Sequence, residues 1–267
     1  MIGARVGAGR EAEVFAWGDD AVVKLFRPGF AGHRTEAAAL TALDGHGIAP
    51  RLIDVVEQDG RTGLVLERLD GRDMLALLQR HPARILRCAR TLAETHRAVH
   101  AVAAPPGLPD LRQVLATRIG RAALPSPLHA FALQVLDGLP DGDRLLHGDY
   151  HPGNVLVAED RVRVIDWVNA ARGAPEADHA RTLLLLRWSA LPPDMPAVFR
   201  ALLRLGRARL AREYARAYLR GSPRSPSTVA SWLTVHAAAR LAEGIEAEHS
   251  VLIRLVDQAR RQARSPR

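Results

Sequence analysis

The sequence predicts a two-lobed α+β fold, in which a small antiparallel sheet carrying one helix precedes a large helical lobe. Up to about residue 69 the apolar runs are short, β-branched and separated by glycine, which is typical of strands. After Asp70-Gly71 the apolar residues recur at helical spacing, interrupted by one strand-like island at 154–168. We therefore expect an N-terminal lobe of residues 1–69, a C-terminal lobe of residues 70–267 and a functional cleft between them.

The N-terminal part predicts four strands and one helix. Gly18-Asp19-Asp20 and Gln58-Asp59-Gly60 have turn composition and join consecutive strands as hairpins. A helical pattern over residues 34–43 ends at Asp44-Gly45. The strands are expected at residues 12–17, 21–26, 51–57 and 62–66.

The C-terminal part predicts seven helices and one hairpin. Proline-rich breaks such as Pro105-Pro106-Gly107 separate several of the helices. Inside the strand-like island, residues 155–157 and 162–165 flank a turn and form the hairpin. The helices are expected at residues 74–102, 111–122, 128–136, 177–189, 197–219, 228–243 and 245–263.

Composition excludes several classes of protein. The chain has 267 residues, of which 48% are hydrophobic and 25% charged, so it can bury a globular core. Cys88 is the only cysteine, which excludes an intrachain disulfide and a cluster of thiolate ligands and fits a reducing compartment. No apolar run is long enough to span a membrane and no signal-peptide pattern is present, so we expect a cytoplasmic protein with no membrane partner.

The basic residues are mostly arginine. Lys24 is the only lysine beside 36 arginines, and the formal net charge is +8. We expect no nucleic-acid partner, because only 4% of residues are aromatic and no block of Lys or Arg forms a tail. Many arginines of residues 195–220 recur at helical spacing, which we interpret as the solvent-facing side of an amphipathic helix. The apolar residues between them are Leu202, Leu203, Leu205, Leu210, Tyr214 and Tyr218.

Residues 147–154, His-Gly-Asp-Tyr-His-Pro-Gly-Asn, contain the strongest chemical signal. Asp149 and Asn154 lie five residues apart on a loop bent by Gly and Pro, and the hairpin that follows returns the chain to Asp166. Two carboxylates and an amide oxygen can therefore meet in a small volume. Such hard oxygen ligands suit Mg²⁺, which binds few protein groups together with phosphates and water. A remaining carboxylate suits a general base or positioning group for phosphoryl transfer.

The motif His-Gly-Asp-x-x-x-x-Asn, followed by Ile-Asp-Trp, resembles the aminoglycoside phosphotransferase and choline kinase-like family, which shares the protein-kinase fold. The resemblance implies that Asp149 is the catalytic base and that Asn154 and Asp166 bind Mg²⁺. It also implies that His147 braces the loop. His151 stands where protein kinases have a lysine that contacts phosphate, so we expect it at the γ-phosphate and count it as catalytic.

The same resemblance implies an ATP site in the N-terminal lobe. Gly7 and Gly9 belong to a turn that enters a strand, where they would approach the phosphates. Lys24 stands on the strand where kinases place their phosphate-pairing lysine, and a guanidinium would replace its compact charge poorly. Glu36, early in the predicted helix of this lobe, is the natural partner of Lys24.

The resemblance covers about residues 3–190 and includes the linker between the lobes. The backbone near Glu67 and Leu69 would meet the adenine base. Over residues 195–267, where family members build much of their substrate pockets, the resemblance fades. The sequence therefore predicts the nucleotide end of the cleft in more detail than the acceptor end.

Three further polar residues are interpreted as structural. Asp178 resembles a family residue that caps its own helix or binds the catalytic loop. His96 and His100 lie one helical turn apart, but the sequence offers no evident third ligand, so we do not expect a metal site there.

The acceptor is expected to be a small molecule with a hydroxyl group: an aminoglycoside, a neutral sugar, an amino alcohol or a nucleoside-like alcohol. Residues 195–267 hold 14 arginines and five acids, a balance that disfavours a polycation. A local acidic wall could still form from Glu243, Glu246 and Glu248.

Two alternatives stay open beside a Mg·ATP-dependent kinase. A metallohydrolase would use His147, Asp149 and His151 as ligands, but would leave Lys24 and Asp166 without a role. A catalytically weak or dead kinase-like module would bind without turnover, although every residue that the resemblance assigns to catalysis is present. The oligomeric state stays open as well.

Overall fold

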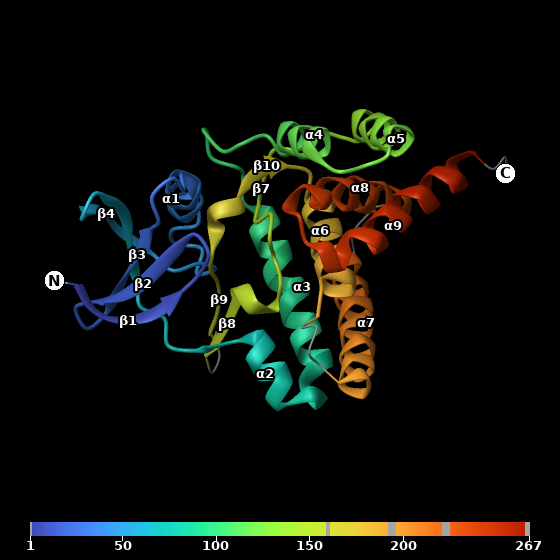
Figure 1. Ribbon diagram of the computed structural model, residues 1–267. Coiled ribbons are helices and arrows are strands. Elements are labelled where there is room, and N and C mark those ends of the chain that lie inside the picture. Colours follow the sequence, from blue (N-terminus) through green and yellow to red (C-terminus); the bar gives the residue numbers. More distant parts are fainter. Residues whose placement is uncertain (1, 159–160, 192–195, 221–224, 265–267) are drawn as a thin grey trace.

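The computed structural model describes residues 2–158, 161–191, 196–220 and 225–264 and has the predicted two-lobed α+β architecture (Figure 1). The N-terminal lobe is one antiparallel sheet of strand order β1-β2-β3-β5-β4, with helix α1 beside it. Its elements are β1 (Ile2–Ala8), β2 (Ala12–Trp17), β3 (Ala21–Phe26), α1 (Gly32–Ala42), β4 (Leu52–Gln58) and β5 (Arg61–Glu67). The predicted strands agree to within a residue at each end.

The alternation of side chains along β3 decides which way Lys24 points. Val23 and Leu25 are buried together on one face of the sheet. Because successive residues of a strand point to opposite faces, Lys24 lies on the other face with Val22 and Phe26. That second face is covered by α1, through Ala39 and Leu40, and by the C-terminal lobe.

The C-terminal lobe is mainly helical, and no helix in the described ranges is long and apolar enough to cross a bilayer. Its helices are α2 (Met74–Arg80), α3 (Ile85–Ala101), α4 (Leu111–Arg121), α5 (Ser126–Asp137), α6 (Pro175–Trp188), α7 (Ala197–Leu219), α8 (Pro226–Arg240) and α9 (Glu246–Arg264). The 3-10 turns are η1 (Pro82–Arg84), η2 (Pro152–Asn154), η3 (Trp167–Asn169) and η4 (Leu241–Glu243). The strands are β6 (Arg72–Asp73), β7 (Arg144–Leu146), β8 (Val155–Ala158), β9 (Arg161–Val164) and β10 (Ala171–Gly173).

Two predicted helices are divided in the structure. The segment 74–102 breaks at His81, whose backbone angles are φ −133° and ψ 69°, because Pro82 lacks an N–H and disfavours helical geometry in the residue before it. The segment 228–243 ends its α-helix at Arg240 and continues as the turn η4. The predicted hairpin is confirmed as β8 and β9, and β6 extends it into a three-stranded sheet.

The prediction for the amphipathic helix is correct only for the second half of α7. Leu210, Tyr214 and Tyr218 are buried, but Leu202 and Leu205 are 59% and 69% exposed. Nor do all of its arginines face solvent: the Arg207 guanidinium donates hydrogen bonds to the backbone carbonyls of Leu185, Leu186 and Ser189.

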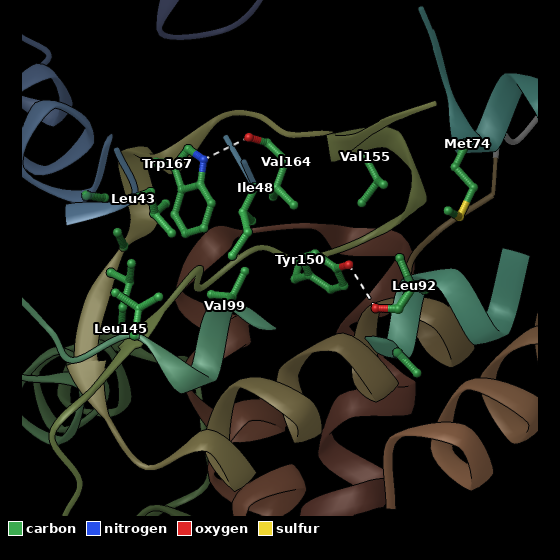
Figure 2. Close-up of a cluster of buried hydrophobic side chains, with 14 of the residues drawn as sticks. Leu43, Ile48, Met74, Leu92, Val99, Leu145, Tyr150, Val155, Val164 and Trp167 are labelled. Carbon is green, nitrogen blue, oxygen red and sulfur yellow. Dashed lines mark hydrogen bonds between the residues drawn. The ribbon is translucent and has the colours of Figure 1, made fainter. Parts of the chain in front are cut away.

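One continuous apolar core joins the two lobes (Figure 2). Leu43 and Ile48, which follow α1, pack with Trp167, whose indole N–H donates to the Val164 carbonyl at 2.9 Å. Tyr150 is fully buried in the same cluster, and its hydroxyl donates to the Leu92 carbonyl of α3 at 2.8 Å. The loop at 147–154 is therefore held on its core-facing side by packed side chains.

Candidate active site

A cleft of about 970 Å³ lies between the lobes, lined by residues of both. Every site residue predicted from the sequence lines this one cleft: Gly7, Gly9, Lys24, Glu36, Glu67, Leu69, Asp149, His151, Asn154 and Asp166. They reach it from the end of β1 and the β1–β2 turn, β3, α1, the end of β5 and the linker after it, the 147–154 loop and the residue that precedes η3.

Lys24 connects the two lobes electrostatically. Its Nζ donates to Glu36 Oε2 at 2.7 Å and to Asp166 Oδ1 at 2.8 Å, and its side chain is only 13% exposed. Burial works against the charged form, but the carboxylates of Glu36 and Asp166 outweigh it and raise the pKa of Lys24. The ammonium group therefore stays protonated at the floor of the cleft.

Glu36 is the anchor behind Lys24. It is 2% exposed, and its second oxygen, Oε1, accepts a hydrogen bond from the backbone N–H of Trp167 at 3.3 Å. Burial raises the pKa of Glu36, while the adjacent Lys24 opposes that rise. Through these contacts α1, β3 and the start of η3 are held together beside Asp166.

Asp166 has an unusual backbone conformation at the point where the hairpin returns to the cleft. Its φ is +68°, in the left-handed region that non-glycine residues seldom adopt. The preceding residue, Ile165, donates its N–H to the Asn154 carbonyl at 3.0 Å, which brings the two predicted metal ligands to neighbouring positions. Such local strain is often found where a side chain must be aimed into a functional site.

The side chains of Asn154 and Asp166 fit a divalent cation. Asn154 Nδ2 donates to the Asp149 carbonyl at 3.0 Å, and no described residue donates to its amide oxygen, which can therefore act as a ligand. Lys24 occupies only one carboxylate oxygen of Asp166. One amide oxygen and one carboxylate are the hard donor set that Mg²⁺ accepts when phosphates and water complete its shell.

The 147–154 loop is held by its own first residues. His147 is fully buried; its Nε2 lies 3.0 Å from the Ile165 carbonyl, to which it donates, and its Nδ1 accepts the Asp149 N–H at 3.2 Å. Both ring nitrogens are thus engaged, as expected for a brace and not for a ligand of the alternative metallohydrolase. Gly148 has φ +77°, and a Cβ there would lie 2.2 Å from the Asn169 carbonyl oxygen, so only glycine fits.

Asp149 lies in the cleft between the Arg181 guanidinium and the His151 ring. Its carboxylate is 3.5 Å from Arg181 NH2 and 3.7 Å from His151 Nε2. Burial opposes its ionisation, but His151 and Arg181 outweigh burial and lower the pKa of Asp149 to about 2. His151 is oriented by the Gly153 N–H, which its Nδ1 accepts at 3.0 Å. Asp149 is therefore ionised at neutral pH and can accept a hydrogen bond from a bound hydroxyl.

Asp178 of α6 binds the backbone of the 147–154 loop, which is the second of the two roles that the sequence analysis gave it. Its carboxylate accepts the backbone N–H groups of His147 at 2.7 Å and Gly148 at 3.0 Å. The same carboxylate lies 3.1 Å from His96 Nε2 and 3.3 Å from His100 Nε2. Burial would raise the pKa of Asp178, but these contacts hold it well below its usual range.

The expectation that His96 and His100 lack a third group is wrong, because Asp178 completes a buried cluster of candidate ligands. Their other ring nitrogens contact the hydroxyls of Tyr214 at 2.7 Å and Tyr218 at 2.6 Å. Burial lowers the pKa of His96 to about 3, so its ring is neutral. Each ring nitrogen of the pair already has a hydrogen-bond partner, which makes the cluster a network that positions the loop.

At the end of the cleft where the sequence analysis expects a nucleotide, the structure differs in detail from the prediction. Gly7 lies within β1, paired with Val14, and not in the turn; Gly9 closes the turn by donating to the Ala12 carbonyl at 2.8 Å. The Glu67 N–H is already used by the Arg51 carbonyl at 2.9 Å. Leu69 makes no backbone hydrogen bond to another described residue, so its N–H is one linker donor available to a ligand.

Sequence reasoning missed three arginines that line the end of the cleft where the sequence analysis expects the acceptor, which we call the acceptor end. Arg118 of α4, Arg181 of α6 and Arg240 of α8 line it, together with Glu243 of η4, which had been considered only as part of an acidic wall. Among 36 arginines these three carry no local motif. They come together only because three different helices pack against one another, and sequence patterns do not predict that packing.

Comparisons with known proteins agree with this geometry. The profile of the phosphotransferase enzyme family matches residues 3–226. A hydroxyurea phosphotransferase of Kitasatospora aureofaciens is 39% identical over 163 residues, which cover 55% of this chain and 44% of that protein. A streptomycin 6-kinase of Streptomyces glaucescens is 36% identical over 158 residues, covering 53% and 47%. The match thus spans less than half the length of either relative.

Among solved structures, the chain is similar to a thermostable mutant of aminoglycoside phosphotransferase APH(4)-Ia in its apo form. The TM-score is 0.68, and the alignment covers 100% of this chain and 96% of that one. The sequence identity is 17%, so this likeness shows a shared fold.

Proposed function

This chain belongs to the phosphotransferase enzyme family, and from that premise we propose that it transfers the γ-phosphoryl group of ATP, with Mg²⁺, to a hydroxyl group of a small molecule. The observation that carries the proposal is the pair of contacts from Lys24 Nζ to Glu36 and to Asp166, at 2.7 and 2.8 Å. They place an obligatorily charged ammonium beside a carboxylate that also faces the cleft. A site that binds the phosphates of a nucleotide with a divalent cation needs this combination.

Residues 1–69 are proposed to bind the nucleotide. Gly7 and Gly9 have no side chains at the edge of the cleft, and the space beside them is open, since a Cβ at either position would meet nothing closer than 3.7 Å. Phosphates would approach the backbone there. The N–H of Leu69, which no described backbone group accepts, would donate to an adenine nitrogen, and Glu67, whose N–H and carboxylate bind the Arg51 backbone, would hold the start of the linker. Lys24 would neutralise charge on the α- and β-phosphates, held in place by Glu36.

Residues 70–267 are proposed to perform the transfer and to bind the acceptor. Asp149 would orient the acceptor hydroxyl through its ionised carboxylate. A carboxylate with a pKa of about 2 is a weak base. Phosphoryl transfer has a loose transition state, in which the bond to the leaving group is largely broken before the hydroxyl must lose its proton, so a weak base is sufficient. His151, 3.7 Å from Asp149, would contact the γ-phosphate.

Asn154 and Asp166 would hold the cation through one amide oxygen and one carboxylate. Bound Mg²⁺ would neutralise the charge that develops on the phosphate oxygens. Because Asp166 Oδ1 accepts a hydrogen bond from Lys24, the other carboxylate oxygen, Oδ2, would be the one that binds the cation.

Coupled-enzyme measurement of ADP release tests this function. We expect Mg²⁺-dependent ADP release that increases with at least one alcohol of a substrate panel, and loss of at least about 100-fold in turnover for Asp149→Asn. Asp143→Asn is the matched control, because Asp143 is 77% exposed and lies outside the cleft. Mg²⁺-dependent ATP binding without any turnover would instead favour the inactive module, and no Mg²⁺-dependent ATP binding would refute both.

A further inference from the structure

At the acceptor end of the cleft the carboxylate of Glu243 is already paired with arginines, so little of its negative charge is available to a ligand. Glu243 accepts a hydrogen bond from Arg181 NH2 at one oxygen and from Arg240 NH1 at the other, each at 2.8 Å. Both carboxylate oxygens are thus already opposed by guanidinium groups. A cationic acceptor would have to compete with two arginines for this one carboxylate.

The acidic wall that the sequence left open does not form. Glu248 is 2% exposed, and its two oxygens bind the Nε and NH2 groups of Arg240. Its Oε1 also accepts the Ala190 N–H at 2.7 Å. Glu246 is exposed at the start of α9 and does not line the cleft. Of the three glutamates, only Glu243 faces the acceptor space.

Arg118, of the three arginines at the acceptor end, has no counter-ion among the described residues. Its one side-chain hydrogen bond goes to Asn169 Oδ1, at 3.4 Å, and no carboxylate of the described residues lies within ion-pair distance. Burial lowers the pKa of Arg118, and the neighbouring charge of Arg181 lowers it further, although Glu243 and Asp149 act in the opposite direction. A partly buried guanidinium that has no carboxylate partner is stabilised by an anion that binds beside it in the cleft.

We propose that the acceptor carries an anionic group, a carboxylate or a phosphate, which the Arg118 guanidinium binds while the hydroxyl is presented to Asp149. The proposal rests on the function proposed above. In the transfer, the hydroxyl oxygen forms a bond to the γ-phosphorus, the bond from that phosphorus to the β–γ bridging oxygen breaks, and ADP leaves with the electron pair. The hydroxyl proton passes to Asp149, and the anionic group stays unchanged as an anchor. A planar guanidinium suits this role because its paired N–H groups match the two oxygens of such an anion.

Anion binding by the loaded enzyme tests the proposal without knowledge of the natural acceptor. The protein is saturated with Mg²⁺ and the non-hydrolysable analogue AMP-PNP, which fills the γ-phosphate position. Malonate, methyl phosphate and the neutral isostere malonamide are then added at constant ionic strength. We expect one or both anions, at about ten times their Kd, to raise Tm by about 2–4 °C, and malonamide to leave it unchanged.

Arg118→Gln should lose the response to the anions, whereas Arg121→Gln should keep it. Arg121 lies on the same helix, is exposed and does not line the cleft, so it is the matched control. The larger of the two anion responses identifies the acceptor's group as carboxylate or phosphate.

Turnover on a shared scaffold supplies the second readout. Galacturonate, galactose and galactosamine differ mainly in charge, and we expect kcat/KM to decrease in that order, with at least a tenfold preference for galacturonate over galactose. In Arg118→Gln this ratio should fall to threefold or less, a comparison that cancels any general loss of activity.

Several results would overturn the inference. An equal response to malonate and malonamide, an unchanged anion response in Arg118→Gln, or a preference for galactosamine would each refute it and leave the proposed function standing. Weakening of AMP-PNP binding by more than tenfold in Arg118→Gln would assign the guanidinium to the nucleotide instead. Failure of the wild type to bind AMP-PNP with Mg²⁺ would refute the proposed function and the inference with it.

Discussion

Replacing Lys24 by arginine keeps the positive charge at the floor of the cleft and changes its shape. Lys24 Nζ is a single point 2.7 Å from Glu36 Oε2 and 2.8 Å from Asp166 Oδ1. A guanidinium distributes its N–H groups over a rigid, wider fork and cannot occupy that point between two carboxylates. We therefore expect Asp166 and the bound phosphates to be displaced. The kcat/KM for ATP should fall at least about 100-fold, or about 2.7 kcal/mol of transition-state stabilisation.

The same substitution should affect stability much less than removal of the charge. In Lys24→Met the carboxylate of Glu36, 2% exposed, would lose its counter-ion, which costs about 3–5 kcal/mol for a buried pair. In Lys24→Arg the counter-ion remains, so we expect a smaller loss of unfolding free energy, about 1–2 kcal/mol from the larger group.

The assay combines steady-state kinetics with varied ATP and urea unfolding of the three proteins. A large kinetic defect with a small loss of stability in Lys24→Arg is the expected pattern. Equal kcat/KM for wild type and Lys24→Arg would show that Lys24 does not contact the nucleotide and would refute the reasoning.

Three further predictions concern the 147–154 loop. Gly148→Ala should lower the unfolding free energy by at least about 2 kcal/mol, because φ is +77° there and the new Cβ would lie 2.2 Å from the Asn169 carbonyl oxygen. Gly120→Ala is the control and should not destabilise the protein, because a Cβ at position 120 meets no atom within 4 Å. Equal effects of the two substitutions in urea unfolding would contradict this prediction. Asp178→Asn should cost about 3 kcal/mol, because the substitution removes a buried charge and puts an NH2 donor in place of one of the two oxygens that accept from His147, Gly148, His96 and His100. A loss under about 1 kcal/mol in the same measurement would reject the anchoring role. The pKa of Asp149 is lowered from 3.8 to about 2 in the folded protein, so its ionisation stabilises the fold above about pH 4, and that contribution is lost as the pH falls from about 4 to 2. Asp149→Asn should make the unfolding free energy less dependent on pH in that window, and an unchanged pH profile would count against the assigned environment.

The sequence predicted the nucleotide end of the site because its residues are tied together by short segments. Asp149 and Asn154 belong to one loop, and the hairpin of β8 and β9 necessarily returns the chain to Asp166. Lys24 was singled out by its place on the strand where the resemblance puts the phosphate-pairing lysine and by being the only lysine in an arginine-rich chain. Local rules of this kind need no knowledge of how the helices pack.

The acceptor end could not be predicted because its residues meet only through packing. Arg118 and Arg181 come from α4 and α6, which are separated by α5, two 3-10 turns, the β8–β9 hairpin and the short strands β7 and β10. Their sequence neighbourhoods resemble those of ordinary surface arginines. Glu248 was a plausible wall residue by composition, but the packing of α8 against α9 turns it toward Arg240. Strands of two or three residues, such as β6, β7 and β10, were missed for the same reason, since they exist only by pairing with distant segments.

Calorimetric titration of AMP-PNP, with and without Mg²⁺, tests the central claim most directly. Asp166→Ala should lose the Mg²⁺-dependent part of nucleotide binding, with Kd raised at least about tenfold, or about 1.4 kcal/mol. Asp149→Ala should bind Mg·AMP-PNP within about threefold of the wild type, because Asp149 acts on the acceptor. If Asp166→Ala bound Mg·AMP-PNP as tightly as the wild type, or if the wild type bound it equally well in EDTA, the assignment of this cleft as a Mg·nucleotide site would be contradicted.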